Sequence, residues 1–202
     1  MASARLPIAS AGAALVCAAL AGAPLAALDL LAFDRQEILA GEFWRVWTGH
    51  AVHYSFEHAL VNAGALLLLG AMCERALGSL RLAAVMLCAC AAVSAGLLLA
   101  LPGLAAYRGA SGLAVMLGFL AGIVLWQARP RARGALLLCV LLWVLKTLLE
   151  AGGIAPDLAG LPEGVQVVWQ AHVMGAACAW LAAHWLMRAP AAYSKRRFFH
   201  QG

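Results

Sequence analysis

Residues that could carry chemistry are few in this apolar chain, and they fall into three short clusters. His58 and Asn62 lie four residues apart, Ser111 lies in the sequence Gly-Ala-Ser-Gly, and His172 lies near the start of the last apolar segment. A serine hydroxyl becomes a nucleophile when a histidine removes its proton, and the oxyanion formed on attack of a carbonyl needs fixed donors. The clusters therefore predict acyl transfer with Ser111 as nucleophile and His172 as base. The side chains of His58 and Asn62 and the backbone N–H of Ser111 would bind the oxyanion.

The composition places these residues in a membrane. Of the 202 residues, 65% are apolar and 11% are charged, whereas a soluble domain is about half apolar and about a quarter charged. A chain of 21.0 kDa has too small an interior to bury so much apolar surface, so a soluble globular fold is excluded. Disordered, collagen-like and coiled-coil chains are excluded because they need more polar residues or a strict repeat. The sequence therefore predicts an all-α membrane protein.

Six apolar segments are long enough to cross a bilayer as helices, for which about 20 residues are needed. We therefore predict a bundle of six transmembrane helices in a single integral membrane domain over residues 1–202. The first segment has features of a cleavable signal peptide, but its apolar stretch is longer than a usual signal core, which favours a retained helix. The segments are residues 8–31, 58–74, 80–101, 111–128, 134–150 and 166–187.

The basic residues orient these segments. The net charge of +5 includes 14 Lys and Arg residues, and most of them flank apolar segments, which indicates membrane orientation rather than nucleic-acid binding. Placing the N-terminus in the cytoplasm puts most of these residues on the cytoplasmic side, with the C-terminus there too. Segments 58–74, 111–128 and 166–187 then run from outside to inside, which brings the three polar clusters to the same outer end. Small residues after Ser111 and His172 would let their helices pack closely.

Motifs around the clusters resemble those of the rhomboid intramembrane serine proteases. The resemblance covers residues 43–187, with the motifs in the family's order. The matching stretches are Trp44–Thr48 followed by His53, His58 and Asn62, then Glu74–Arg75 followed by Gly78, then Gly109–Gly112, and Ala171–Gly175. Two positions depart from the family pattern: Val115 stands where a tyrosine often stacks on the base histidine, and Ala179 stands where a second glycine is usual.

The resemblance implies a six-span, rhomboid-like bundle that uses a Ser111–His172 dyad with no acidic third member. It also implies a water-filled cavity that opens outward, where His58 and Asn62 help to bind the oxyanion. The implied activity is cleavage of membrane-anchored proteins at or near their transmembrane segment, in a bacterial inner membrane, with both termini cytoplasmic and the site on the periplasmic side. The implied partners are these substrates and the lipid bilayer, without nucleic acid. No metal or cofactor is implied, and the oligomeric state is left open.

A narrower resemblance is to the rhombosortase branch, which is compact and has a Lys-x-x-x-Glu pattern before the last outer loop. Lys146 and Glu150 match that pattern. The branch is associated with bacterial proteins that end in Gly-Gly, a hydrophobic helix and a basic tail, so the resemblance implies removal of that C-terminal sorting tail. An alternative interpretation is that both long side chains simply extend to the outer membrane interface.

Three other functions fit the residues less well. A zinc protease of the His-Glu-x-x-His type needs Glu directly after the first His, and this spacing is absent from His50, His53, Glu57 and His58. A transporter would be expected to show inverted repeats and charged groups at the bilayer midplane. A catalytically inactive rhomboid-like protein that binds and escorts membrane clients would be expected to lose the serine or the histidine, and both are present.

Overall fold

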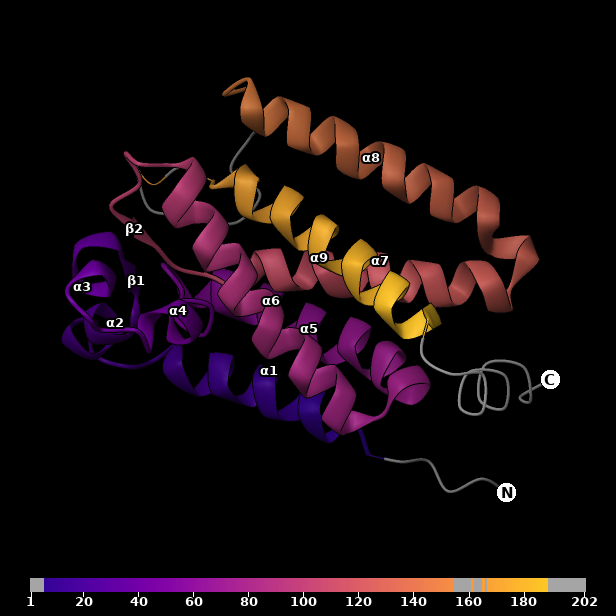
Figure 1. The fold of residues 1–202 in the computed structure, drawn as a ribbon, viewed down its shortest axis with the longest axis horizontal. Helices are drawn as coiled ribbons and strands as arrows, with labels where there is room; N and C mark the ends of the chain where they lie inside the picture. Colours follow the sequence, from indigo (N-terminus) through magenta and orange to yellow (C-terminus); the bar gives the residue numbers. More distant parts are fainter. Residues whose placement is uncertain (1–5, 155–160, 162–164, 166, 189–202) are drawn as a thin grey trace.

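The part of the chain that the structure describes is mostly helical (Figure 1). The structure, a computed structural model, describes residues 6–154, 161, 165 and 167–188. Its longer helices are α1 (Ile8–Leu20), α5 (Phe56–Leu77), α6 (Ser79–Ala100), α7 (Ser111–Ala128), α8 (Arg133–Ala151) and α9 (Trp169–Arg188). Its short elements are α2 (Leu25–Leu31), β1 (Phe33–Asp34), α3 (Arg35–Leu39), α4 (Arg45–Thr48), β2 (Ala106–Tyr107) and a 3-10 turn at Pro130–Ala132. The predicted all-α class is therefore confirmed.

Four helices in the described residues are long and apolar enough to cross a membrane. They are Phe56–Leu77, Ser79–Ala100, Ser111–Ala128 and Pro130–Ala151, the last of which joins the 3-10 turn to α8. They coincide with the second to fifth predicted segments, and the chain is thus a membrane protein. α1 is a shorter apolar helix of 13 residues. α9 corresponds to the predicted segment 166–187; residue 166 and both chain ends, predicted to be cytoplasmic, lie outside the described residues.

The prediction of one continuous helix over residues 8–31 is wrong. α1 ends at Leu20, and α2 begins at Leu25, directly after Pro24. Proline has no backbone N–H to donate and disfavours the helical conformation in the residue before it, so a helix does not run smoothly through this position. Counting apolar residues does not register such a break.

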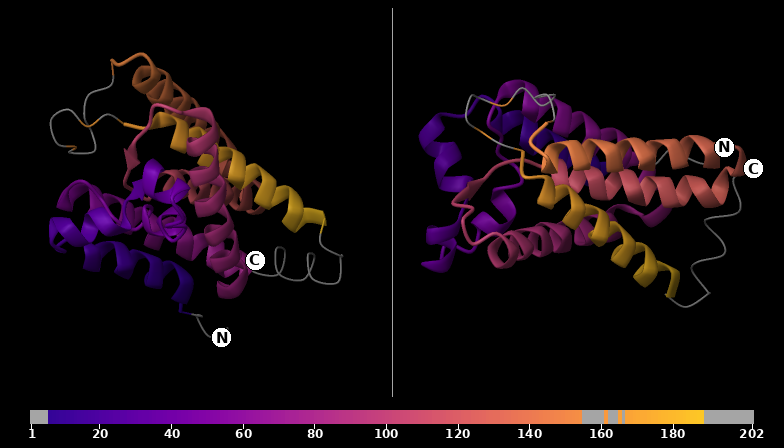
Figure 2. Two further views of the ribbon diagram at one scale, coloured as in Figure 1. Left: turned by 60° about the vertical axis from the view of Figure 1, so that its left-hand side comes forward. Right: turned by 90° about the horizontal axis from the view of Figure 1, so that it is seen from above.

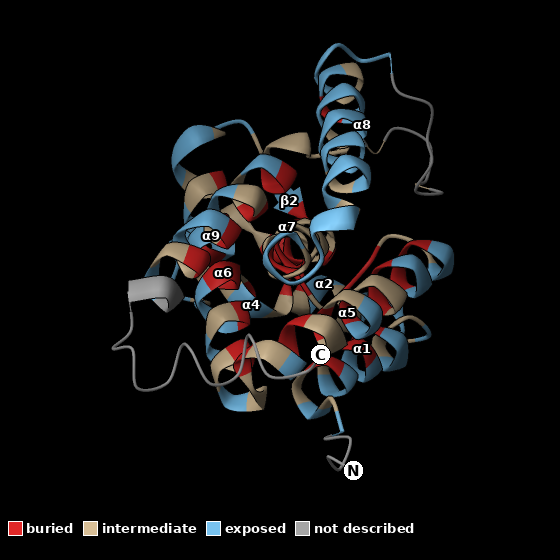
Figure 3. Ribbon diagram, turned by 90° about the vertical axis from the view of Figure 1, so that its right-hand side faces the viewer, coloured by how far each residue is buried: buried red, intermediate tan, exposed pale blue. Residues whose placement is uncertain are grey.

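α7 lies at the centre of the bundle, where Figure 3 shows it almost end-on with its buried residues facing the surrounding helices. It packs against α5 and α9, and α1 packs against α5. A helix that is apolar all round can be surrounded by other helices in this way. The buried residues of α7 are Gly112, Leu113, Met116, Leu117, Leu120 and Ala121.

α8 lies on the outside of the bundle. It follows α7 through the turn at Pro130–Ala132 and diverges from α7 along its length in Figure 1, although the two helices overlap in the right-hand view of Figure 2. Thr147 is the only residue of α8 that is buried as a whole, and Leu141 is 65% exposed. Apolar side chains on such a helix suit a lipid environment, because they cost little when lipid rather than water surrounds them.

A buried carboxylate near the end of α5 holds α1. Glu74 accepts hydrogen bonds from the backbone N–H groups of Ala9 and Ser10, both at 3.0 Å, and from the Ser10 hydroxyl at 2.6 Å. N–H groups in the first turn of a helix have no intrahelical partner, and the helix dipole favours an anion there. Gly70 leaves room for this contact, because a Cβ at that position would lie 2.6 Å from the Ser10 Oγ. Glu74, from the Glu74–Arg75 motif, therefore anchors α1 against α5.

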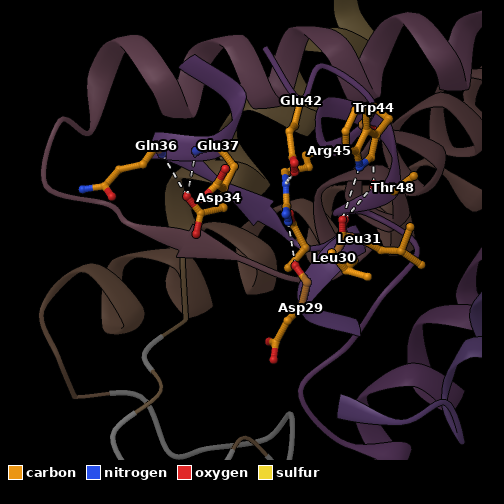
Figure 4. Close-up of polar contacts among 11 residues, drawn as sticks. Asp29, Leu30, Leu31, Asp34, Gln36, Glu37, Glu42, Trp44, Arg45 and Thr48 are labelled. Atoms are coloured by element: carbon orange, nitrogen blue, oxygen red, sulfur yellow. Dashed lines mark hydrogen bonds and ion pairs between the residues drawn. The ribbon is translucent and has the colours of Figure 1, made fainter. Parts of the chain in front are cut away.

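The segment between α1 and α5 gathers at the end of the bundle where α7 begins (Figure 1). β1 pairs with β2 in antiparallel fashion, with Phe33 opposite Tyr107. Arg45 donates to the backbone oxygens of Asp29 and Ala32, at 2.6 and 2.9 Å, and Figure 4 shows it among the neighbouring polar contacts. Carbonyl groups at the end of α2 lack helical partners, so this arginine satisfies them.

Arg35 joins the same segment to α6. Its guanidinium donates to four backbone oxygens in and just after the last turn of α6, those of Leu97, Leu98, Leu101 and Leu104. A cation at a helix C-terminus is favoured by the free carbonyl groups and by the helix dipole. The short elements are thereby fixed against the chain that leads into β2 and α7.

Candidate active site

Ser111 is the first residue of α7, and the turn before it is held on three sides. The Gly109 N–H donates to the Gly49 oxygen at 3.0 Å, and the Tyr107 hydroxyl donates to the Gly109 oxygen at 2.7 Å. The Ala110 N–H donates to His53 Nε2 at 3.2 Å. Gly109 has φ +134°, which L residues rarely adopt, and a Cβ there would lie 3.0 Å from a carbon of the His58 ring. A glycine is therefore required before the serine.

The glycines after Ser111 and His172 bring their two helices into backbone contact. A Cβ added at Gly112 would lie 2.9 Å from the Ala171 oxygen, and a Cβ added at Gly175 would overlap the Gly112 oxygen. Small residues permit this close approach of membrane helices. As a result His172 Nε2 lies 3.0 Å from Ser111 Oγ, within hydrogen-bond distance.

His58 and Asn62 lie on the first two turns of α5 and are buried. Ser55 caps this helix, because its Oγ accepts the His58 N–H at 3.1 Å. Asn62 Nδ2 donates to the His58 oxygen at 2.8 Å. An amide nitrogen carries two N–H groups, so this bond uses one of them.

All four predicted site residues line one cavity. The cavity has a volume of about 270 Å³ and is bounded by residues of α5, α7, α8 and α9 and of the chain around β2. Its wall is mostly apolar, and Val115 and Trp143 contribute to it. Its polar lining residues are Tyr54, His58, Asn62, Tyr107, Arg108, Ser111, Lys146, Glu150 and His172. An apolar cavity with a few convergent polar groups is the usual form of a small binding or reaction site.

Residues 40–189 match the family model of the rhomboid domain. The chain belongs to the rhomboid family. No curated protein matches the sequence. Rhomboid domains are in general intramembrane serine proteases, and the matched region of this rhomboid contains the serine, the histidine and both residues of α5 described above.

A carboxylate lies on the far side of the His172 ring, where the resemblance to rhomboids implies no acid. Glu150 Oε2 lies 3.2 Å from His172 Nδ1, and Glu150 Oε1 accepts a hydrogen bond from Lys146. The Glu150 side chain is 5% exposed, whereas that of Lys146 is 44% exposed. Glu150 therefore does not extend to the membrane surface; it turns into this rhomboid's cavity.

His53 and His50 lie in the loop before α5, and both are buried. Burial lowers the pKa of His53 to about 3, with a further contribution from the nearby His58, and burial lowers the pKa of His50 to about 4. A neutral imidazole has one nitrogen that can accept a hydrogen bond. Because His53 Nε2 accepts the Ala110 N–H, this neutral form is the one that supports the turn before Ser111.

The structure brings the four residues predicted from the sequence together, but it also shows contacts that the sequence did not predict. Ser111, His172, His58 and Asn62 all line the cavity. The sequence indicated no specific role for His53, although His53 belongs to the rhomboid-like motif that begins at Trp44. In the sequence, Glu150 stands out only as part of the Lys146-x-x-x-Glu150 pattern. An acid at the outer end of an apolar segment, level with the serine and histidine, was the signal that could have placed it in the site.

Proposed function

We propose that this rhomboid is an intramembrane serine endopeptidase in which Ser111 is the nucleophile and His172 is the base. The observation that carries the proposal is the 3.0 Å separation of Ser111 Oγ and His172 Nε2, inside a cavity that His58 and Asn62 also line. A base within hydrogen-bond distance of a serine hydroxyl is the geometric requirement for nucleophilic catalysis.

The proposed reaction has two steps. His172 Nε2 removes the Ser111 proton as Oγ attacks the scissile carbonyl carbon, and the C–N bond then breaks as His172 gives that proton to the leaving amine. His172 next removes a proton from water as the water oxygen attacks the acyl carbon, and it gives that proton to Ser111 Oγ as the bond between Oγ and the acyl carbon breaks. The oxyanion formed in each step is bound by the backbone N–H of Ser111 and the side chains of Asn62 and His58. N–H groups at the start of α7 suit this role, because the first N–H groups of a helix have no intrahelical partner.

We also propose a six-span topology in which α1 and α9 complete the bundle and the site opens to the periplasmic side of a bacterial inner membrane. Arg75 and Arg81 flank one turn of the long helices, and Arg129, Arg131 and Arg133 flank another. Both turns lie at the opposite end of their helices from Ser111, and basic residues favour the cytoplasmic side. In a cysteine-free background, an impermeant maleimide should label Gly103→Cys in intact cells, and Arg131→Cys only after lysis. The reverse pattern would overturn this orientation.

The proposed substrates are membrane-anchored proteins, and in particular secreted proteins that end in Gly-Gly, a hydrophobic helix and a basic tail. The Lys146-x-x-x-Glu150 pattern supports this rhombosortase-like substrate class, and the cavity beside Ser111 would take a small, easily extended segment such as Gly-Gly. The competing function is an inactive rhomboid that binds and escorts membrane clients.

A fluorophosphonate probe separates the enzyme from the escort protein. The protease should be labelled at Ser111, and cells that express it should cleave a reporter with a Gly-Gly tail. Ser111→Ala and His172→Ala should each abolish cleavage. His184→Ala is the matched control, because His184 lies on the same helix but stacks on Trp180. Processing by either active-site variant would refute the assignment.

Asn62→Ala tests the oxyanion site separately. Loss of one oxyanion donor typically lowers kcat by about 10²- to 10³-fold. Labelling and cleavage rates of purified protein in detergent would measure that loss. Unchanged turnover would remove Asn62 from the site while leaving the serine and histidine in it.

A further inference from the structure

Glu150 is an ionisable residue that an otherwise exposed helix turns into the protein. The neighbouring side chains of α8 include Leu148, which is 64% exposed, and Leu145, which is 53% exposed, whereas the Glu150 side chain is 5% exposed. A carboxylate in apolar surroundings is costly unless it is paired and hydrogen-bonded. Its two oxygens meet such partners, because Oε2 lies beside His172 and Oε1 beside Lys146.

The position of this carboxylate decides which nitrogen of His172 can act as the base. A carboxylate accepts and does not donate, so a hydrogen bond at 3.2 Å between Glu150 Oε2 and His172 Nδ1 requires the proton on Nδ1. In the neutral ring Nε2 then carries the lone pair, and Nε2 is the nitrogen that faces Ser111 Oγ. The contact thus selects the tautomer that nucleophilic activation needs.

We propose that Glu150 is a positioning residue that completes a Ser111–His172–Glu150 triad, with Lys146 holding its carboxylate in place. The inference rests on the proposed function. In the reaction, the Ser111 proton moves to Nε2, the Nδ1 proton stays on His172, and Glu150 remains an anion that stabilises the imidazolium. When Nε2 passes its proton to the leaving amine, the ring returns to the same tautomer. The acid comes from α8, a helix separate from those that supply the other two members.

The Lys146 ammonium is the second group that contacts the Glu150 carboxylate. It lies one helical turn before Glu150 on α8 and contacts the oxygen that His172 does not use. This contact fixes the direction of the second carboxylate oxygen. Lys146 thereby offsets part of the cost of placing a carboxylate in apolar surroundings.

Substitution of Glu150 tests the triad through kinetics. In Glu150→Gln the amide can donate to Nδ1 and select the wrong tautomer, so kcat should fall by up to about 10⁴-fold, as when the acid of a Ser-His-Asp triad becomes an amide, with little change in KM. Glu150→Asp, which keeps the charge, should recover part of the loss.

Lys146→Met should lower kcat by about 10- to 100-fold, as for loss of one hydrogen bond to a charged group, and Lys146→Arg should retain most activity. Glu37→Gln on α3 is the matched control, because Glu37 is exposed and far from the cavity lining.

A second measurement does not depend on turnover. Nitrogen-15 NMR of histidine-labelled protein reports the tautomer of His172, which His172→Ala assigns. Wild-type protein and Ser111→Ala should both show the Nδ1–H tautomer with a strongly hydrogen-bonded proton, and Glu150→Gln should lose it. Wild-type kcat and an unchanged His172 tautomer in Glu150→Gln would overturn the triad. Failure of the proposed function would look different: wild-type protein would show this tautomer but would neither be labelled at Ser111 nor cleave the reporter.

Discussion

The two helices that flank His172, α7 and α8, are held by different kinds of contact. α7 lies in the centre of the bundle and meets α9 backbone to backbone at Gly112 and Gly175. α8 lies outside, with one residue buried as a whole, and reaches α9 through the polar contact of Glu150 with His172. The distance between Ser111 and His172 is therefore set by steric contact on one side, and the orientation of the His172 ring by a hydrogen bond on the other.

This difference follows from what holds helices together in a membrane. Helix packing in lipid depends on van der Waals contact and hydrogen bonds, because apolar burial from water contributes little between helices. Close contact along α7 and α9 leaves little freedom to change the distance between Ser111 and His172. α8 has few such contacts, so its polar residues carry a larger share of its attachment.

The largest effect should follow from filling the contact between α7 and α9. Gly175→Ala places a Cβ on the Gly112 oxygen, so the two backbones must separate. Misplacement of reacting groups by about 1 Å can cost about 10²-fold in rate, and we expect at least that loss in reporter cleavage and probe labelling.

Gly118→Ala is the matched control for this substitution. Gly118 lies on α7, and a Cβ there would meet only a Leu69 methyl group at an ordinary 3.7 Å. It should therefore keep nearly full activity. Equal activity of Gly175→Ala and Gly118→Ala would show that close packing does not set the catalytic distance.

Leucine truncation compares the two helices through stability. Leu117→Ala on α7 removes a side chain that is 0% exposed and should lower the free energy of unfolding by about 2–5 kcal/mol. Leu141→Ala on α8 removes one that is 65% exposed and should change it by less than about 0.5 kcal/mol. Denaturant unfolding in mixed micelles measures both values. Similar losses would mean that α8 is packed as tightly as α7.

The sequence predicted the central helices well because their signals are local. Apolar length and flanking charges placed α5, α6, α7 and α8 within three residues of the observed ends, and spacing within motifs marked Ser111 and His172. Pro24 broke the first predicted helix, although proline is itself a local signal. Gly109 and Gly112 also belong to a local motif. The turn before α7 requires Gly109, and the contact with α9 requires Gly112.

The features that sequence did not predict depend on contacts between distant parts of the chain. Pairing of Phe33 with Tyr107 and of Glu150 with His172 joins residues far apart in sequence. No periodicity or spacing within one segment reports such a pair. The role of Glu150 was further obscured because a charged residue near a helix end often extends to the membrane surface.

A more gradual effect is expected in the turn before α7 at acid pH, because the titratable side chain of His53 supports the packed side of the site. The pKa of His53 is lowered from 6.5 to about 3 by burial and by His58, so its contribution to stability is complete above pH 6.5 and is lost as the pH falls toward 3. The unfolded state binds the proton first in this range, and stability falls by at most about 1.4 kcal/mol per pH unit for this group. A protonated Nε2 would also point its proton at the Ala110 N–H, which now donates to it.

His53→Asn keeps an acceptor but does not titrate, so its melting temperature should fall less than that of wild type between about pH 7 and about pH 5. His50, with a pKa of about 4, remains in both proteins and accounts for the residual slope. Identical slopes would show that His53 does not link the Ser111 turn to pH.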